Sequence, residues 1–143
     1  MNPAPLFNRQ RDMMNTDQAL AVYETTRASL TGEMTFPQIV ERLSAAGVER
    51  YHADYTRREK TFYFVDGEAL VIEIPWGRHE TASEFSASVV ESAVRQSQRG
   101  EHTYLDFVRK TMAAGCVGYF VQITGRQAQY FGRNGEIHVE KFP

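Results

Sequence analysis

The sequence predicts an α+β protein built from two copies of an α-α-β-β-β unit. Residues 17–75 align with residues 85–143 at a constant offset of 68 positions and without a gap. Helical spacing of apolar residues marks the first half of each copy, and alternating strand patterns mark the second half. The aligned identical pairs include Gly32/Gly100, Thr35/Thr103, Gly47/Gly115, Arg58/Arg126, Gly67/Gly135 and Pro75/Pro143. We expect two antiparallel three-stranded meanders and four helices, related by a pseudo-two-fold axis.

The 143 residues are expected to form a single domain over residues 17–143. A copy of 59 residues buries little core by itself, so the two copies should pack against each other. Residues 1–16 precede the repeat and are interpreted as a flexible arm. Residues 76–84 link the copies, and Trp76 is expected to cap the seam between them.

The first helix of each copy is predicted over about residues 17–30 and 82–98, where apolar side chains recur at three-to-four spacing. The segment 81–84, Thr-Ala-Ser-Glu, fits a capping box at the start of the later helix. Gly32 and Gly100 follow these helices and suit left-handed caps.

The second helix of each copy is predicted to begin at Thr35 and at Thr103. In both places a hydroxyl residue is followed three positions later by a residue that can complete a capping box, Gln38 or Asp106. Both helices are expected to end at an Ala-Ala-Gly sequence.

Three short strands should follow in each copy. The expected strands are residues 51–55, 61–65 and 69–74 in the first copy, and 119–123, 129–133 and 137–142 in the second. Asp66-Gly67 and Asn134-Gly135 predict hairpins with type I′ turns. The last strand of the first copy, Ala69–Ile74, is apolar on both faces, which predicts cover from the other unit or from a second chain.

The composition excludes several classes of protein. A net charge of −2 with dispersed basic residues argues against nucleic-acid binding. No apolar run is long enough for a transmembrane helix, and the N-terminal residues lack the pattern of a signal peptide. The single cysteine, Cys116, excludes an intramolecular disulfide. We therefore expect a cytoplasmic location and no membrane or nucleic-acid partner.

The second copy resembles the DUF1398 family. The matching motifs are Gly100–Phe107, Ala113-Ala-Gly115, Tyr119, Tyr130-Phe131, Asn134-Gly135 and Glu140–Pro143. The resemblance extends over about residues 17–143 and implies a small bacterial or prophage protein, sometimes labelled a phage envelope protein. These motifs are turns and aromatic residues, so the resemblance implies no catalytic residues and no cofactor.

One set of residues has the chemistry of a ligand site. His52 and Asp54 lie two apart on one predicted strand, and His138 and Glu140 repeat this spacing on another. Two imidazoles and two carboxylates would suit a borderline metal such as zinc. The alternative is a solvated sheet face, since nothing in the sequence shows that the two strands adjoin.

A matched pair of arginines is the second candidate. Arg58 and Arg126 occupy the same turn in both copies, which suggests anion contacts or a dimer contact, with a salt bridge as the alternative. Cys116 follows a helix end and is interpreted as a small buried residue. His102 is interpreted as a surface residue, and His79 as part of a polar linker.

The function predicted from these observations is non-enzymatic binding through the cleft between the copies or through an exposed sheet surface, with a homodimer as one possibility. Tyr63, Phe120 and Phe131 would form an apolar patch on that surface if they point away from the helices. Two alternatives stay open, namely a small metal-dependent or acid–base enzyme and a small-anion sponge. No P-loop, dinucleotide-binding turn or nucleophile elbow occurs.

Overall fold

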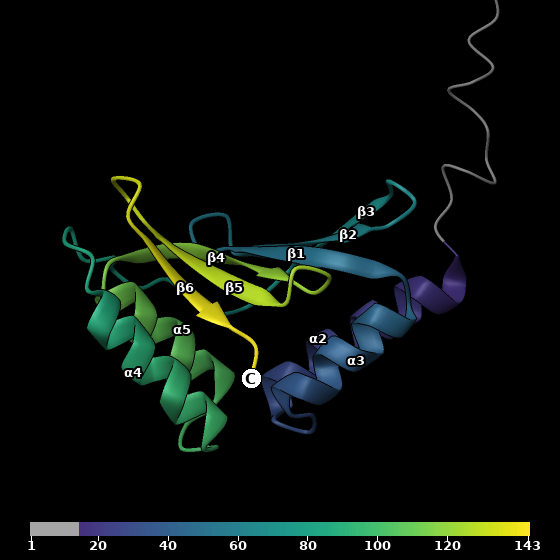
Figure 1. Ribbon diagram of the computed structural model, residues 1–143, viewed down its shortest axis with the longest axis horizontal. Coiled ribbons are helices and arrows are strands. Elements are labelled where there is room, and N and C mark those ends of the chain that lie inside the picture. The colour runs from purple at the N-terminus through teal and green to yellow at the C-terminus, as the bar shows by residue number, and fades with distance from the viewer. Residues whose placement is uncertain (1–14) are drawn as a thin grey trace, which may run out of the picture.

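A computed structural model describes residues 15–143, in which four helices pack on one face of a six-stranded antiparallel sheet (Figure 1). This confirms the α+β class. The helices are α2 Thr16–Thr31, α3 Phe36–Ala45, α4 Ala87–Gln98 and α5 Tyr104–Ala113. The strands are β1 Val48–Asp54, β2 Glu59–Phe64, β3 Ala69–Glu73, β4 Cys116–Gln122, β5 Gln127–Gly132 and β6 Ile137–Lys141. The predicted arm lies almost entirely outside the described residues, and its last residue, Thr16, begins α2.

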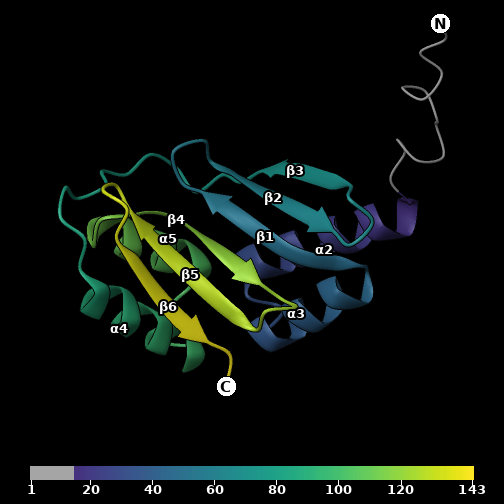
Figure 2. The same cartoon turned by 45° about the horizontal axis from the view of Figure 1, so that its top comes forward.

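The strand order is β3-β2-β1-β4-β5-β6, so the two three-stranded meanders join into one sheet through β1 and β4 (Figure 2). The β1–β4 ladder runs from the pair Arg50↔Gln122 to the pair Asp54↔Gly118. This central pairing places β3 and β6 at the two edges of the sheet. The other unit therefore does not cover β3, which corrects one of the two expectations for that strand.

Local capping sequences set most of the helix ends. Thr35 with Gln38, and Thr103 with Asp106, form the two expected capping boxes. Each hydroxyl accepts a hydrogen bond from a backbone N–H of the first turn, and the partner side chain accepts the N–H of the capping residue. Gly32 ends α2 in the left-handed conformation with φ 77°, as expected.

The start of α4 differs from the prediction. The helix begins at Ala87 with Ser86 as its N-cap, and residues 82–86 are not helical. Backbone N–H groups of Ala82 and Ser86 instead donate to the carbonyls of Met112 and Ala114 at 3.0 and 2.8 Å. These carbonyls lie at the end of α5, where a helix has no following turn to donate N–H groups to its last carbonyls. The tertiary hydrogen bonds therefore outweigh the local capping signal of residues 81–84.

The hairpin turns also differ from the predicted type. Gly67 has φ 94°, but Asp66 is not among the residues with positive φ, so a type I′ turn is excluded. Gly67 N–H donates to the Phe64 carbonyl at 3.0 Å, and Phe64 N–H donates to the Glu68 carbonyl at 2.9 Å. This is a type I turn followed by a left-handed glycine, the usual geometry of a three-residue hairpin loop.

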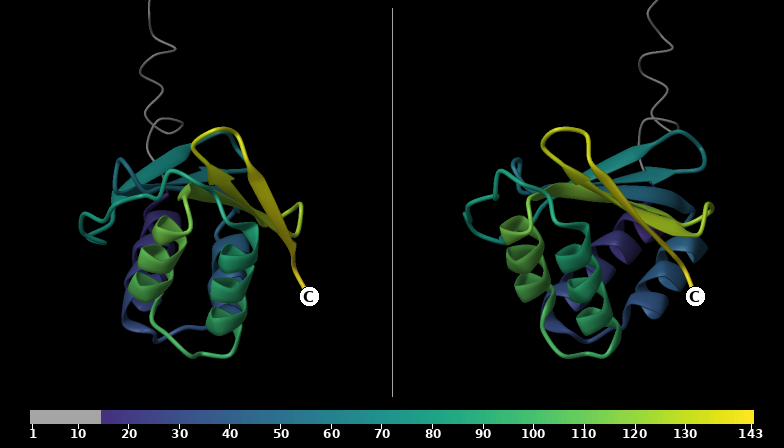
Figure 3. Two further views of the ribbon diagram at one scale, coloured as in Figure 1. Left: turned by 90° about the vertical axis from the view of Figure 1, so that its left-hand side faces the viewer. Right: turned by 60° about the vertical axis from the view of Figure 1, so that its left-hand side comes forward.

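The core lies between the helices and the helix-facing side of the sheet (Figure 3). Val22, Val90 and Val108 are fully buried on the helices and pack with inward strand residues such as Tyr51 and Tyr119. Among the described residues, none of the helices combines the length and apolar character needed to cross a membrane.

Candidate functional site

The side of the sheet opposite the helices, here called the open face, is not covered by any element of residues 15–143 (Figures 1 and 3). Alternate residues of all six strands point to it, and strand register aligns them in three cross-strand rows. The rows are Ala69-Tyr63-Arg50-Gln122-Gln127-Lys141, Val71-Thr61-His52-Phe120-Gln129-Val139 and Glu73-Glu59-Asp54-Gly118-Phe131-Ile137.

Aromatic rings occupy the centre of the open face. The His52 and Phe120 rings stack at a centroid distance of 4.5 Å, and Phe131 meets Phe120 edge-on at 6.2 Å. The Arg50 guanidinium lies 4.2 Å from the centroid of the Tyr63 ring, a cation–π distance. The three aromatic residues named in the sequence analysis therefore point away from the helices; Phe120 and Phe131 form one group with His52, and Tyr63 lies in the adjacent row beside Arg50.

Burial against Phe120 makes His52 an uncharged part of this group at neutral pH. Desolvation lowers the pKa of the His52 imidazole, against the smaller opposing effect of the Asp54 and Glu59 carboxylates. A neutral imidazole stacked on phenylalanine behaves as an aromatic surface with a polar edge.

Exposed aliphatic and charged residues surround the aromatic centre. Val71, Val139 and Ile137 are 52%, 44% and 57% exposed on the two edge strands. Asp54, Glu59 and Glu73 adjoin one another in one corner, because β1, β2 and β3 bring them into register. The positive residues Arg50 and Lys141 lie in a different row. The face is thus apolar at its centre and charged at its rim.

The four residues of the predicted ligand site are not brought together. His52 and Asp54 lie on the open face of β1, whereas His138 and Glu140 lie on the helix-facing side of β6, beside buried Tyr130. Two strands, β4 and β5, separate β1 from β6. The four side chains therefore cannot coordinate one ion, because first-shell ligands lie about 2 Å from a metal.

His138 and Glu140 instead join two residues of α4 that the sequence analysis missed. Glu140 Oε2 lies 2.6 Å from His138 Nε2, and its Oε1 accepts from Arg95 at 2.9 Å. Arg95 also lies 3.6 Å from Glu91, and ligand atoms of Glu91, His138 and Glu140 are all within 4.8 Å of one another. The group has the donors of a three-ligand metal site, but Arg95 already forms ion pairs with both of its carboxylates. The i,i+4 spacing of Glu91 and Arg95 was the available signal.

Arg58 and Arg126 share a left-handed backbone conformation. They have φ of 57° and 55°, the left-handed region, in the tight turns after β1 and β4. Their carbonyls accept the N–H groups of Ile74 and Phe142 at 2.9 and 3.0 Å, just beyond the edge strands. The antiparallel β1–β4 ladder places these turns at opposite ends of the sheet, about 20 Å apart by strand rise, so the two arginines do not share a small anion.

Lys60 is a further residue whose environment the sequence analysis missed. It lies on the helix-facing side of β2, is 5% exposed, and its Nζ lies 4.3 Å from the centroid of the Tyr104 ring and 5.4 Å from that of Tyr51. Burial lowers the pKa of the ammonium to about 7. Lys60 alternates with outward-facing residues of β2, and this alternation was the sequence feature that could have indicated its burial. The repeat gave no help, because the counterpart of Lys60 in the second unit is Ala128.

The Lys60 amine belongs to an aromatic cluster at the seam between the units. The hydroxyls of Tyr104 and Tyr119 lie 2.7 Å apart, and buried Trp76 contacts Tyr104 and Tyr55 with ring centroids 6.3 and 5.4 Å apart. Trp76 thus lies between the units, as expected. Its Nε1 has no hydrogen-bond partner among residues 15–143. Any ligand could reach this amine only after aromatic side chains move.

The remaining candidates are not reactive groups. Cys116 is fully buried, burial raises the pKa of its thiol to about 11, and Sγ donates to the Gly118 carbonyl at 3.2 Å. A protonated, enclosed thiol is a poor nucleophile. His102 is half-buried, with Nε2 2.7 Å from the Ser97 hydroxyl, and His79 is exposed.

Comparison with known proteins identifies only the family. Residues 79–141, which span the linker and the second unit, match the family described as "Protein of unknown function (DUF1398)". This confirms the family resemblance, although the match is narrower than the expected residues 17–143. No curated protein matches the chain. The linker and second unit of the chain are therefore similar to the DUF1398 family.

Proposed function

We propose that this chain is a non-enzymatic binding protein that recognises another protein through the open face of its sheet. The observation that carries the proposal is the presence of Tyr63, His52, Phe120 and Phe131 on a face that no other described element covers. Aromatic and aliphatic side chains gathered on one uncovered face of a folded domain are typical of interaction sites.

The composition of the open face supports a protein partner. Protein interfaces combine an apolar core enriched in aromatic residues and arginine with a polar rim. The aromatic centre and the Arg50–Tyr63 contact provide the core, and the charged residues lie around it. Asp54, Glu59 and Glu73 would repel phosphate groups, so nucleic acid is a poorer fit.

The same residues define the chemistry of the partner. The aromatic centre would accept aliphatic or aromatic anchors, and the carboxylates of Asp54, Glu59 and Glu73 would pair with lysine or arginine at one end of the partner surface. Because opposite charges fix the orientation of the partner, the two features together define a binding direction across the sheet.

Site-specific photo-cross-linking in cells tests the proposal. A benzophenone side chain replaces Phe120 on the open face or, as the matched control, Leu105, which is 40% exposed on α5. We expect one discrete protein adduct from position 120 and none from position 105. Absence of an adduct at position 120, or the same adducts at both positions, would contradict the proposal.

Affinity measurements with the purified partner complete the test. Phe120→Ala should weaken binding by tenfold or more if the aromatic centre is a hot spot, which corresponds to about 1.4 kcal/mol. Leu105→Ala should leave the dissociation constant unchanged. An adduct whose purified protein binds Phe120→Ala and wild type equally would be an incidental neighbour and would refute the role of the open face.

We further infer that the two units arose by duplication and are related by a pseudo-two-fold axis near the β1–β4 ladder. All six strands, and α3 with α5, recur at the offset of 68 residues found in the sequence, and the strand order is symmetric about β1 and β4. The left-handed Arg58 and Arg126 recur at the same offset. A prophage origin and a cytoplasmic location stay predictions.

A further inference from the structure

The hydrogen bonds at the two ends of edge strand β3 show which of its backbone groups point away from β2. Ile74 N–H donates to the Arg58 carbonyl and Phe64 N–H donates to the Glu68 carbonyl, which bracket the β2–β3 ladder. Because hydrogen-bonded pairs alternate in an antiparallel ladder, Leu70 and Ile72 direct their backbone groups to β2. The N–H and C=O groups of Ala69, Val71 and Glu73 therefore point outward, with no partner strand among residues 15–143.

The edge formed by β3 lacks the protection that the opposite edge has. Strand β6 carries His138, Glu140 and Lys141, and α4 packs against it through the Arg95 ion pairs. Charged residues and covering helices are the usual devices that keep an edge strand from pairing. The residues of β3 are Ala-Leu-Val-Ile-Glu, with a single charge at the end.

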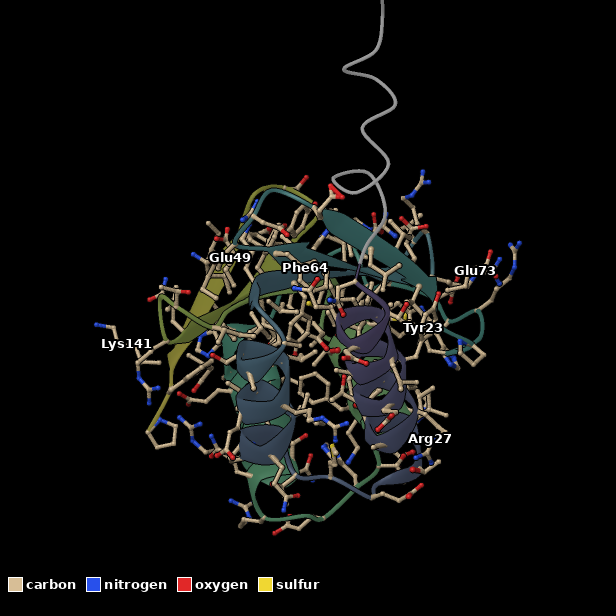
Figure 4. All side chains as sticks on the ribbon, turned by 90° about the vertical axis from the view of Figure 1, so that its right-hand side faces the viewer. Tyr23, Arg27, Glu49, Phe64, Glu73 and Lys141 are labelled. Atoms are coloured by element: carbon tan, nitrogen blue, oxygen red, sulfur yellow. The ribbon has the colours of Figure 1, made fainter. Side chains whose placement is uncertain are left out.

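The helix beside β3 extends this apolar edge. Leu20 and Tyr23 of α2 are each 52% exposed, and α2 lies on the β3 flank of the molecule in two opposite views (Figures 3 and 4). At the offset of 68, Tyr23 corresponds to Glu91, and Leu70 and Ile72 correspond to His138 and Glu140. Glu91, His138 and Glu140 of the ionic cluster thus have less polar counterparts in the first unit, whereas Arg95 corresponds to Arg27, which pairs with Glu33 instead.

We propose that β3 pairs with β3 of a second copy of this chain to form a two-fold symmetric dimer. The outward phase of Ala69, Val71 and Glu73 allows a register in which Val71 lies opposite its own symmetry mate, with Ala69 opposite Glu73 and Leu70 opposite Ile72. In this register no two charges face each other, and the apolar side chains of Leu70 and Ile72 pack across the junction. Because β3 can pair with a copy of itself without placing like charges opposite each other, we favour a second copy of the chain over an unrelated strand.

The pairing would join two six-stranded sheets into one continuous sheet. Directly opposed residues of an antiparallel pair project to the same side, so both open faces would lie on one side of the dimer. A partner with two matching surfaces would then gain avidity. Dimer formation does not depend on the proposed function, because it uses the edge of the sheet and not the open face.

Light scattering coupled to size-exclusion chromatography tests the proposal, from roughly 5 µM to roughly 200 µM because dimer formation depends on concentration. The wild-type chain should run at about twice its 16.3 kDa mass. Val71→Pro removes an outward N–H without breaking the β2–β3 ladder and should give a monomer. Val139→Pro, at the equivalent outward position of β6, is the matched control and should stay dimeric.

A charged variant keeps the test valid if proline disturbs folding. Val71→Lys adds the residue most often used to block edge pairing and should also give a folded monomer, whereas Val139→Lys should not. Circular dichroism checks that each variant is folded. A wild-type monomer over the whole range would overturn the proposal and leave the edge to a strand of a different protein. Equal dimerisation of the Val71 and Val139 variants would overturn it as well.

Discussion

Replacing Lys60 by methionine is expected to stabilise the protein and to remove a pH dependence of its stability. Lys60 is 5% exposed, and its pKa falls from 10.5 to about 7 through desolvation alone. Methionine has a similar length and makes favourable contacts with aromatic rings, so Tyr51 and Tyr104 should pack against it without a cavity. The substitution therefore isolates the free energy of burying the amine.

The sign and size follow from proton linkage. Between about pH 7 and 10.5 the unfolded chain binds a proton at Lys60 that the folded chain does not bind, so stability rises with pH in this window. Below about pH 7 both states are protonated and the full penalty is present. A shift from 10.5 to about 7 corresponds to a penalty of about 5 kcal/mol at most. From pH 7 to pH 9 the free energy of unfolding of the wild type should rise by about 2–3 kcal/mol.

Urea denaturation followed by fluorescence of the buried Trp76 measures this effect at several pH values between about 6 and 9. The Lys60→Met curve should lie above the wild type at pH 6, and the difference should shrink as pH rises. Lys141→Met, at an exposed lysine of β6, is the control and should change neither stability nor slope. Parallel pH curves for wild type and Lys60→Met would refute the reasoning, because they would show that the amine is solvated in the folded state.

Two further predictions concern a close backbone contact and the ionic cluster of the second unit. Gly115→Ala should destabilise the protein by several kcal/mol more than Gly47→Ala, although both glycines have φ near 90°. A Cβ at Gly115 would lie 2.2 Å from the Glu84 carbonyl oxygen, whereas the closest atom to a Cβ at Gly47 is a side-chain nitrogen at 3.2 Å. Equal urea midpoints for the two variants would contradict this prediction. Zinc should raise the melting temperature of Arg95→Ala but not that of the wild type, because Arg95 occupies the carboxylates that would bind the ion. Adding Glu91→Gln to Arg95→Ala should abolish this rise in melting temperature. A rise in the melting temperature of the wild type with zinc would contradict the prediction and support a metal site.

Features that depend on neighbours in sequence were predictable. The capping boxes at Thr35 and Thr103 and the left-handed Gly32 each involve groups within one helical turn, so the sequence pattern is sufficient. The same local reasoning failed at residues 82–86, because the partners of that segment are carbonyls at the end of α5, about 30 residues away.

The candidate site was predictable only in part. A patch of Tyr63, Phe120 and Phe131 was predicted only on the condition that they point away from the helices, because alternation within a strand gives no information on which strands adjoin. The two-residue spacing correctly predicted that His52 and Asp54 share one face of their strand, and that His138 and Glu140 share one face of theirs. The structure then places the two pairs on opposite faces, because the register across β4 and β5 aligns His52 with Val139, which leaves His138 and Glu140 on the other side of the sheet.

The sequence by itself determined the order of helices and strands, α-α-β-β-β followed by α-α-β-β-β, and the helix ends with local caps, since these depend on periodicity and on residues close in the chain. Only the tertiary structure decided that β1 pairs with β4, which makes β3 an unprotected edge. It also decided that Lys60 lies among tyrosines and that Glu91 and Arg95 meet His138 and Glu140. The physical reason is that these contacts join residues distant in sequence, so no pattern of neighbouring residues specifies them.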